Sequence, residues 1–372
     1  MKTLKFLILF LIVTILSTCD DKPKYLTVIN TDGSCYKLIE AFADSSFMVG
    51  DTARSNPFGV ELDSTWKISW SYITPEYKTN WPLKSWTFDT TMAHKEAPVK
   101  VRALKKYSSV EEMAKNFRFN KDHEWRTIQP KYKLEKKFRW FYTYYVYSEV
   151  YPKIKTFSNF PIEKYMTKEE AEFWFNGNPD LVKGMNGIEI GSETDRIEDN
   201  FNKWFEQNIW EEEMDVLLKH YDLLKKPPVT KEKLTSDKDS LFLEFHNKQK
   251  EKNEEKDFSK FLDKQYKTNV FSELYSREGN PLKAYEESLD SNKFLDYYEK
   301  SIDYNLIMPG TIIMADNAIN HGDTLKFNLD AYRMTYKDYE IKATSRKTNI
   351  WAFGVTGIIV LLVIGSFFVK RR

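Results

Sequence analysis

The 372-residue sequence predicts an α+β protein: a discontinuous, curved antiparallel β domain with an α-helical insertion, followed by one transmembrane helix. Three observations lead to this prediction. Apolar and polar residues alternate up to residue 160 and again from residue 301, as in half-buried strands. Between these points the apolar period changes to about three and a half, which is helical. The run Ile350–Val369 contains no charged residue.

The run Ile350–Val369 is long enough to cross a membrane as a helix. At about 1.5 Å of rise per residue, such a helix matches the roughly 30 Å hydrocarbon core. Three cations, at 370–372, follow it directly. We therefore expect a membrane span at 350–369.

The N-terminus has the features of an export signal. Lys2 and Lys5 precede a short apolar run, which ends in Leu16-Ser17-Thr18-Cys19. These last four residues resemble the lipobox of bacterial lipoproteins. The resemblance implies that residues 1–18 are a lipoprotein-type signal peptide and that Cys19 is the lipid-attachment (palmitate) residue. Ordinary signal cleavage and an uncleaved anchor are the alternatives.

Export of the N-terminus and one later span predict the topology. The cations at 342, 346 and 347 balance those at 370–372, so the positive-inside comparison is a tie, which the signal sequence breaks. We expect a single-pass protein of the bacterial cell membrane, with the bulk of the chain extracytoplasmic (periplasmic) and the C-terminus cytoplasmic.

Charge is unevenly distributed over the predicted ectodomain, residues 19–349. Residues 161–300 hold 32 acidic and 22 basic side chains, a net charge of −10, and the rest carries +6. Either the two parts attract each other, or the basic part faces anionic head groups or glycans. Cys35 is the one cysteine besides Cys19, so the chain is not a disulfide scaffold; a Cys19–Cys35 bridge is the alternative if Cys19 is not lipidated.

The predicted β domain begins with residues 19–160. Tyr25–Asn30 and Ser34–Phe42 are joined by Asp32-Gly33, a hairpin signal. Further elements are predicted as strands at Trp66–Tyr72, Ser85–Thr91 and Val99–Lys105, and as a short helix at Val110–Phe117, capped by Ser108 or Ser109.

The longest β pattern runs from Lys131 to Tyr151 without Gly or Pro. A single strand of this length would far exceed the usual 3 to 10 residues, so we expect it to bulge or to break into two. The residues of one parity are mostly aromatic: Tyr132, Leu134, Phe138, Trp140, Tyr142, Tyr144 and Val146. We expect them to line one hydrophobic interior, either a packed core or a ligand cavity.

The helical insertion is predicted at 161–300. Thr167 and Glu170 form a capping-box pattern, and Gly177 ends that helix. Ser192 is expected to cap the next helix. Others are predicted at Ser240–Gln249, Phe258–Arg277 and Leu282–Glu299.

The last strands of the β domain are predicted at 301–345: Leu306–Ala315, Thr324–Leu329 and Tyr339–Thr344. The alternative is three consecutive small domains. This segment carries a family resemblance through Met308-Pro309-Gly310-Thr311-Ile312, the run Gly322–Phe327 and Ala343-Thr344-Ser345. It resembles the end of LppM-like bacterial membrane-anchored extracytoplasmic domains. The resemblance implies a lipoprotein-type β domain with a C-terminal anchor and a lipid-binding role.

No motif for catalysis, cofactor binding or metal binding is found in the sequence, and nothing indicates nucleic-acid binding. The residues that could suggest chemistry are more simply explained as structural. They are the scattered single histidines, Cys35, the run Glu211–Glu213, and a turn of Asp316, Asn317, Asn320 and Asp323 that could suggest a calcium site. The histidines are His94, His123, His220, His246 and His321.

The leading hypothesis is a non-enzymatic cell-envelope protein whose β domain binds a hydrophobic or lipid-like ligand or a membrane partner. One alternative is an extracytoplasmic enzyme that acts on glycan or lipid. The other is a structural subunit of an envelope complex that docks through the acidic helical part.

Overall fold

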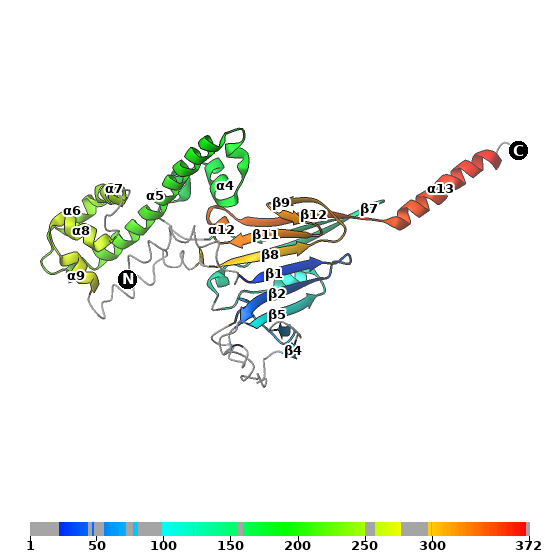
Figure 1. The fold of residues 1–372 in the computed structure, drawn as a ribbon, viewed down its shortest axis with the longest axis horizontal. Helices are drawn as coiled ribbons and strands as arrows, with labels where there is room; N and C mark the ends of the chain where they lie inside the picture. The colour runs from blue at the N-terminus through cyan, green and yellow to red at the C-terminus, as the bar shows by residue number, and fades with distance from the viewer. Residues whose placement is uncertain are drawn as a thin grey trace. The chain divides into compact units, whose positions relative to one another are not determined.

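The structure is a computed structural model that describes residues 22–43, 47, 56–71, 77–80, 99–121, 123–154, 159–249, 257–276, 297–298 and 300–369 (Figure 1). Cys19, the signal peptide 1–18, the strand Ser85–Thr91 and nearly all of the helix Leu282–Glu299 lie outside these residues. The fold class is α+β, as predicted. The chain divides into a β unit, Asp21–Lys153 with Lys300–Arg372, and a helical unit, Ile154–Glu299.

Sheet A of the β unit has eight strands in the order β10-β11-β8-β1-β2-β5-β3-β4. They are β1 (Lys24–Ile29), β2 (Cys35–Ala43), β3 (Lys67–Ser71), β4 (Tyr77–Asn80), β5 (Val99–Tyr107), β8 (Ser301–Ile307), β10 (Ile319–His321) and β11 (Thr324–Asp330). The predicted first hairpin is confirmed as β1 and β2. The purely antiparallel prediction is wrong, because β1 and β8 run parallel. Parallel neighbours need a long connection, and most of the chain lies between these two strands.

Sheet C has four strands in the order β6-β7-β12-β9. They are β6 (Lys131–Arg139), β7 (Tyr142–Tyr151), β9 (Thr311–Asp316) and β12 (Tyr339–Thr348). Side chains of β7 contact those of β2 and β8, so the two sheets face each other. The β unit is therefore built on two open sheets, and strands from before and after the helical unit occur in both.

The long β pattern breaks into β6 and β7 at Trp140–Phe141. Arg139 pairs with Tyr142 across this turn. Each even-numbered residue of β6 therefore lies opposite an odd-numbered residue of β7. The inner face has even-numbered residues on β6 and odd-numbered residues on β7. The prediction that Tyr142, Tyr144 and Val146 share the inner face with Tyr132 is therefore wrong.

The predicted strand Leu306–Ala315 also breaks, because Pro309 and Gly310 carry the chain from β8 in sheet A to β9 in sheet C. Gly310 has a φ of 81°. A Cβ atom there would overlap the carbonyl oxygen of Arg346 on the neighbouring strand. Glycine is thus required at this crossing, both for its backbone angle and for the close approach.

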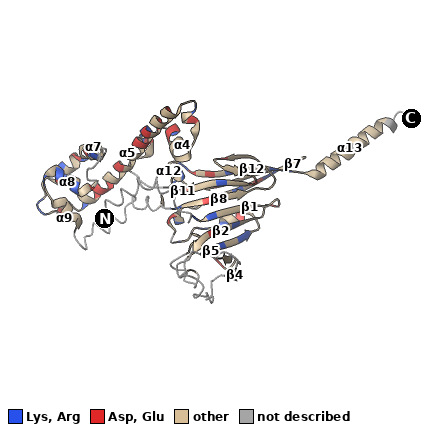
Figure 2. Cartoon of the chain, in the orientation of Figure 1, with Lys and Arg blue, Asp and Glu red and all other residues tan. Residues whose placement is uncertain are grey.

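In the part of the β unit that the structure describes, the helices with assigned bounds are α3 (Val110–Asn116), η1 (Glu124–Thr127), α12 (Arg333–Tyr336) and α13 (Ile350–Val369). The helical unit contains η2 (Ile162–Lys164), α4 (Lys168–Asn176), η3 (Pro179–Val182), α5 (Gly187–Lys219), η4 (Tyr221–Leu223), α6 (Lys231–Ser236), α7 (Lys238–Gln249), α8 (Phe258–Tyr266) and α9 (Val270–Ser276). Aromatic and aliphatic side chains around Trp210, Met214 and Phe261 form a core in this unit. Acidic residues recur along α5 (Figure 2).

Caps explain where these helices begin. Ser109 caps α3, and the Thr167–Glu170 capping box opens α4, both as predicted. The prediction that Ser192 caps the next helix is wrong: α5 begins earlier, with a capping box of Asn186 and Glu189. Its first turns are exposed to solvent, so they carry no apolar periodicity that would have placed the cap there. The predicted helix Phe258–Arg277 is two helices, α8 and α9, separated by a left-handed residue at 267.

Candidate functional site

The two faces of β7 differ in burial. Its odd-numbered residues, from 143 to 151, are buried between the sheets, whereas the even-numbered ones, from 142 to 150, are half-exposed. The inner face carries a polar cluster that joins both sheets. The Glu149 cluster consists of Glu149, Tyr147 and Tyr151 from β7 with Thr27, Lys37 and Tyr304 from sheet A.

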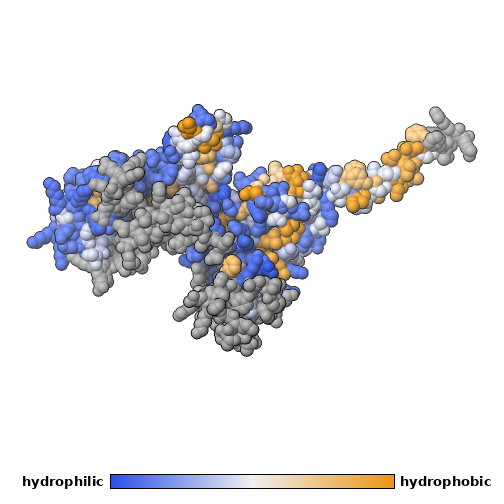
Figure 3. Space-filling view, viewed as in Figure 1, coloured by the Kyte–Doolittle hydropathy of each residue, from blue (hydrophilic) through white to orange (hydrophobic). Residues whose placement is uncertain are grey.

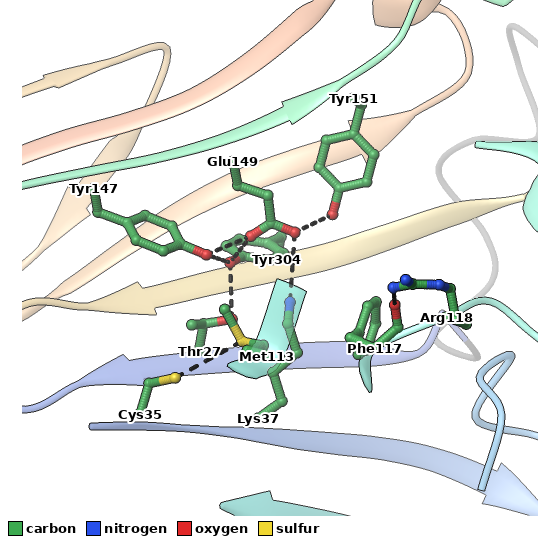
Figure 4. Close-up of polar contacts among 10 residues, drawn as sticks. All are labelled: Thr27, Cys35, Lys37, Met113, Phe117, Arg118, Tyr147, Glu149, Tyr151 and Tyr304. Carbon is green, nitrogen blue, oxygen red and sulfur yellow. Dashed lines mark hydrogen bonds and ion pairs between the residues drawn. The ribbon is translucent and has the colours of Figure 1, made fainter. Parts of the chain in front are cut away.

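Four donors surround the carboxylate of Glu149, which is 0% exposed (Figure 4). Its Oε2 accepts hydrogen bonds from the hydroxyls of Tyr147, at 2.8 Å, and Tyr304. Its Oε1 accepts one from Tyr151, at 2.5 Å, and one from the ammonium of Lys37, at 3.4 Å. Because a carboxylate accepts about four hydrogen bonds, the protein itself fills every position around Glu149.

Lys37 supplies the positive charge of the cluster, and its side chain is 1% exposed. Its Nζ lies 4.5 Å from the ring centre of Phe117, 5.2 Å from that of Tyr132 and 5.1 Å from that of Tyr304. Aromatic faces attract a desolvated cation. The rings thus compensate the sides of the ammonium that do not face Glu149.

The electrostatics of the cluster keep its tyrosines neutral. Burial raises the pKa of Tyr147, Tyr151 and Tyr304 well above the ordinary value, and the charge of Glu149 raises the pKa of each further. Burial lowers the pKa of Lys37, and attraction by Glu149 opposes part of that shift. The tyrosines therefore remain proton donors to Glu149 over the whole neutral range.

This geometry fits a structural link between the sheets better than a site that acts on a ligand. The cluster connects β7 of sheet C with β1, β2 and β8 of sheet A, and its carboxylate is saturated. Removing one partner of a buried ion pair typically costs about 3–5 kcal/mol. Sequence reasoning missed Glu149, although the alternation Tyr147, Glu149, Tyr151 was a usable signal once the parity of β7 was known.

The opposite surface of sheet C, called here the outer face, is open and amphiphilic. On β7, one of its two central strands, the half-exposed residues are Tyr142, Tyr144, Val146, Ser148 and Val150. Cations stand on the flanking strands: Lys131, Lys133, Lys137 and Arg139 on β6, and Lys342 and Arg346 on β12. Acidic residues on this face are fewer: Glu135, Asp316 and Glu340.

Contacts between neighbouring strands and along β6 organise the outer face. The guanidinium of Arg346 lies 4.8 Å from the ring centre of Tyr142. Glu135 pairs with Lys133 at 2.6 Å and with Lys137 at 2.7 Å, and hydrogen bonds from these lysines lower the pKa of Glu135 to about 2. The face keeps an excess of positive charge beside an apolar and tyrosine-rich stripe.

The helix α13 follows β12 after a single residue, Asn349. The side-chain amide of Asn349 donates to the carbonyls of Arg139, at 2.9 Å, and Trp140, at 3.1 Å. Its backbone N–H donates to the carbonyl of Phe141 at 2.9 Å. One residue thus ties the β6–β7 turn to the start of the helix.

Aromatic rings extend this contact. Phe138, Trp140 and Phe141 of the turn form a cluster with Trp351 and Phe353 of α13. Ring centres lie 6.3 Å apart for Phe138 and Trp351, 5.3 Å for Trp140 and Trp351, and 4.6 Å for Phe141 and Phe353. The indole N–H of Trp140 donates to Thr356 Oγ1 at 2.8 Å.

In the part of the chain that the structure describes, α13 is the one helix long and apolar enough to cross a membrane. Its window Ile350–Phe367 is 6% buried, so most of its apolar side chains beyond the first turn have no protein cover (Figure 3). An exposed apolar surface of this size marks a membrane or partner contact. This supports membrane association.

The residues considered from sequence lie apart. Burial raises the pKa of the Cys35 thiol to about 12, which makes it an inert core residue, as expected. His123 caps η1, and burial lowers its pKa to about 4. His220 ends α5, His246 contacts Glu206, and His321 is exposed at the end of β10.

His94 lies outside the described residues. Glu211, from the acidic run on α5, pairs with Lys238. Asp316, Asn317, Asn320 and Asp323 are exposed around β10. Among the described ranges, no three or more His, Cys, Asp or Glu side chains are grouped as a metal ion would require.

No protein-family model matches the chain, and comparisons with curated proteins and with solved structures give no match.

Proposed function

We propose that this chain is a non-enzymatic protein of the bacterial cell membrane, whose extracytoplasmic β unit binds an anionic, lipid-like amphiphile on the outer face of sheet C. The C-terminus is cytoplasmic, α13 is the span, and an acyl group on Cys19 is a second anchor. The observation that carries the proposal is the half-exposed stripe from Tyr142 to Val150 with cations on both sides.

The chemistry of the outer face suits such a ligand. Tyrosine and valine side chains on β7 can cover an acyl chain, because burying apolar area contributes about 25 cal/mol per Å². Lysine and arginine on β6 and β12 can pair with a phosphate or carboxylate head group. A lipid-binding role is also what the LppM-like resemblance of the closing segment implies.

Cross-linking within a bilayer tests this proposal. The full chain is placed in nanodiscs that contain a photoactivatable phosphatidylglycerol, and cross-linked peptides are identified by mass spectrometry. Outside α13 and the β6–β7 turn, peptides of β7 and β12 should dominate, and these cross-links should weaken with a photoactivatable phosphatidylcholine. Tyr144→Asp should reduce them, because it places a negative charge in the stripe.

Phe42→Asp is the matched control. Phe42 is 43% exposed on β2 of sheet A, so the substitution adds the same charge away from the outer face. It should leave the cross-links on β7 unchanged. Equal yields from both variants, or no preference for β7 and β12, would exclude the outer face as the binding site.

The β unit is further proposed to be one discontinuous, curved domain with residues 161–300 as an insertion. The pairing of β1 with β8, and of β7 with β12, supports this arrangement. A chain with 161–300 replaced by a Gly/Ser linker should keep a cooperative, strand-rich transition. Loss of that transition would favour separate domains.

A second candidate function, docking of an envelope partner through the helical unit, is favoured by one observation. Ile188, in the first turn of α5, is 87% exposed, and Met185 beside it is 37% exposed. Ile188→Asp should abolish co-purification of a partner from cross-linked membranes if this candidate is right, whereas Tyr144→Asp should not.

A further inference from the structure

The turn between β6 and β7 has an unusual composition. Two-residue hairpin turns in water favour Asn, Asp and Gly, which supply the required backbone angles and hydrogen bonds. Here the two turn residues are Trp140 and Phe141, and the flanking Phe138 is 57% exposed. Trp140 itself is 44% exposed. Large rings at a turn are costly in water and favourable at a membrane interface.

The length of α13 determines the depth of this turn. Its 20 residues give about 30 Å, which only just matches the hydrocarbon core. If the core began beyond Thr356, the remaining turns would span only about 20 Å. The first two turns of α13 must therefore lie within the bilayer, and the indole of Trp140 is hydrogen-bonded to Thr356 in the second of them.

The backbone of the turn meets the main requirement for entering a membrane. Irregular backbone is tolerated there only when its polar groups have partners within the protein. The carbonyls of Arg139, Trp140 and Phe141 all accept hydrogen bonds from Asn349. Asn349 thus replaces the water that would otherwise hydrate this turn.

Charged residues stand where head groups would meet them. Arg139 ends β6, and Lys347 lies next to the end of β12, both exposed. Long cationic side chains extend along apolar surface while their charges stay in the head-group layer. An aromatic tip flanked by such cations is the pattern of an interfacial anchor.

We infer that the tip of the β6–β7 hairpin, Phe138–Phe141, is inserted into the outer leaflet as a second protein element beside α13. This inference rests on the proposed role of α13 as a membrane span. Its rings occupy the level of the first two helical turns, about 10 Å deep. The bilayer itself is the binding partner of this surface, through its acyl chains and anionic head groups.

Photo-cross-linking with a benzophenone amino acid tests this placement. The probe replaces Phe138, Ile359 in the middle of α13, or Phe42 on sheet A, each in the full chain in liposomes of phosphatidylethanolamine and phosphatidylglycerol. The probe at Phe138 should form adducts near the head-group end of the acyl chain, and the probe at Ile359 near its methyl end. The probe at Phe42 should form none.

The outcomes separate the two proposals. Adducts at Ile359 without adducts at Phe138 would overturn hairpin insertion and leave the membrane span intact. Absence of adducts at Ile359 would overturn the span and the hairpin inference with it. A second probe, at Trp140, serves as a check, because the probe at Phe138 removes the stacking between Phe138 and Trp351. If neither hairpin position forms lipid adducts, the inference is overturned.

Discussion

The two faces of β7 use one residue type in opposite ways. On the inner face, Tyr147 and Tyr151 are buried and donate to Glu149. On the outer face, Tyr142 and Tyr144 are half-exposed beside lysine and arginine. The comparison shows that burial and partners, rather than residue type, decide what a tyrosine does. One strand thereby supplies both a link between the sheets and the surface proposed for binding.

Alkaline pH should destabilise the buried tyrosines of the inner face, and this should be the largest of the expected effects on the free energy of unfolding. Tyrosines of the unfolded chain lose their protons near pH 10, whereas the folded state holds those of Tyr132, Tyr147, Tyr151 and Tyr304 to higher pH. Stability from these groups is complete below pH 10. Above it, each group should remove about 1.4 kcal/mol per pH unit from the free energy of unfolding.

Thiol labelling of Cys35 during urea unfolding measures this loss, because Cys35 is buried in the β unit. Tyr304→Phe is the matched variant, and above pH 10 its slope should be shallower by about 1.4 kcal/mol per pH unit. Lys37 has the opposite effect, because its pKa is lower in the folded chain than in the unfolded chain. The free energy of unfolding therefore increases as the pH rises toward the unfolded-state pKa of Lys37, and Lys37 causes no further change above that pH. Identical slopes for the two proteins would contradict the buried tyrosine cluster.

Glu149→Gln should have the next largest effect. The substitution leaves the Lys37 ammonium buried without its counter-charge, so the free energy of unfolding should fall by about 3–5 kcal/mol. The same labelling of Cys35 measures it at neutral pH. The double variant with Lys37→Met removes the stranded charge and should recover a large part of the loss. A double variant as unstable as Glu149→Gln alone would refute the ion pair as the cause.

Removal of one hydroxyl from each face sharpens the comparison. Tyr147→Phe leaves an oxygen of Glu149 short of a donor and should cost about 1–3 kcal/mol. Tyr144→Phe, on the same strand, removes a hydroxyl from a half-exposed surface and should stay within about 0.5 kcal/mol. Unfolding of both variants under identical conditions is the measurement. Equal losses would mean that the two faces are not distinct.

The smallest expected effect on stability comes from Glu135→Gln on the outer face. Its partners, Lys133 and Lys137, are exposed, so unfolding should not change measurably. The variant also frees two cations, and cross-linking to phosphatidylglycerol should increase. A decrease in cross-linking would indicate that Glu135 itself contacts the ligand.

The elements that sequence reasoning predicted correctly are those with local causes. The hairpin at Gly33, the capping box at Thr167 and the helix at 350–369 each depend on residues within a few positions of one another. The same holds for the break of the long β pattern, which strand length alone requires.

The features that were missed depend on distant partners. Lys37 and Glu149 are 112 residues apart, and no local pattern indicates their pairing. The turn at Trp140–Phe141 lacks turn residues because Asn349 and α13 hold it in place. Because the sequence does not reveal the position of this turn, it does not show that the odd-numbered residues of β7 are the buried ones. The prediction therefore placed the even-numbered residues of β7 on the inner face.

The one-residue connection between β12 and α13 has a mechanical consequence. Any force that pulls on the helix is transmitted directly along β12, which is paired over its full length, from Tyr339 to Thr348, with β7. Such a load shears the whole ladder at once instead of peeling it pair by pair. If α13 spans the membrane, as proposed, extraction of this anchor would have to break the pairing with the strand that carries Glu149, so the centre of the β unit would bear the load.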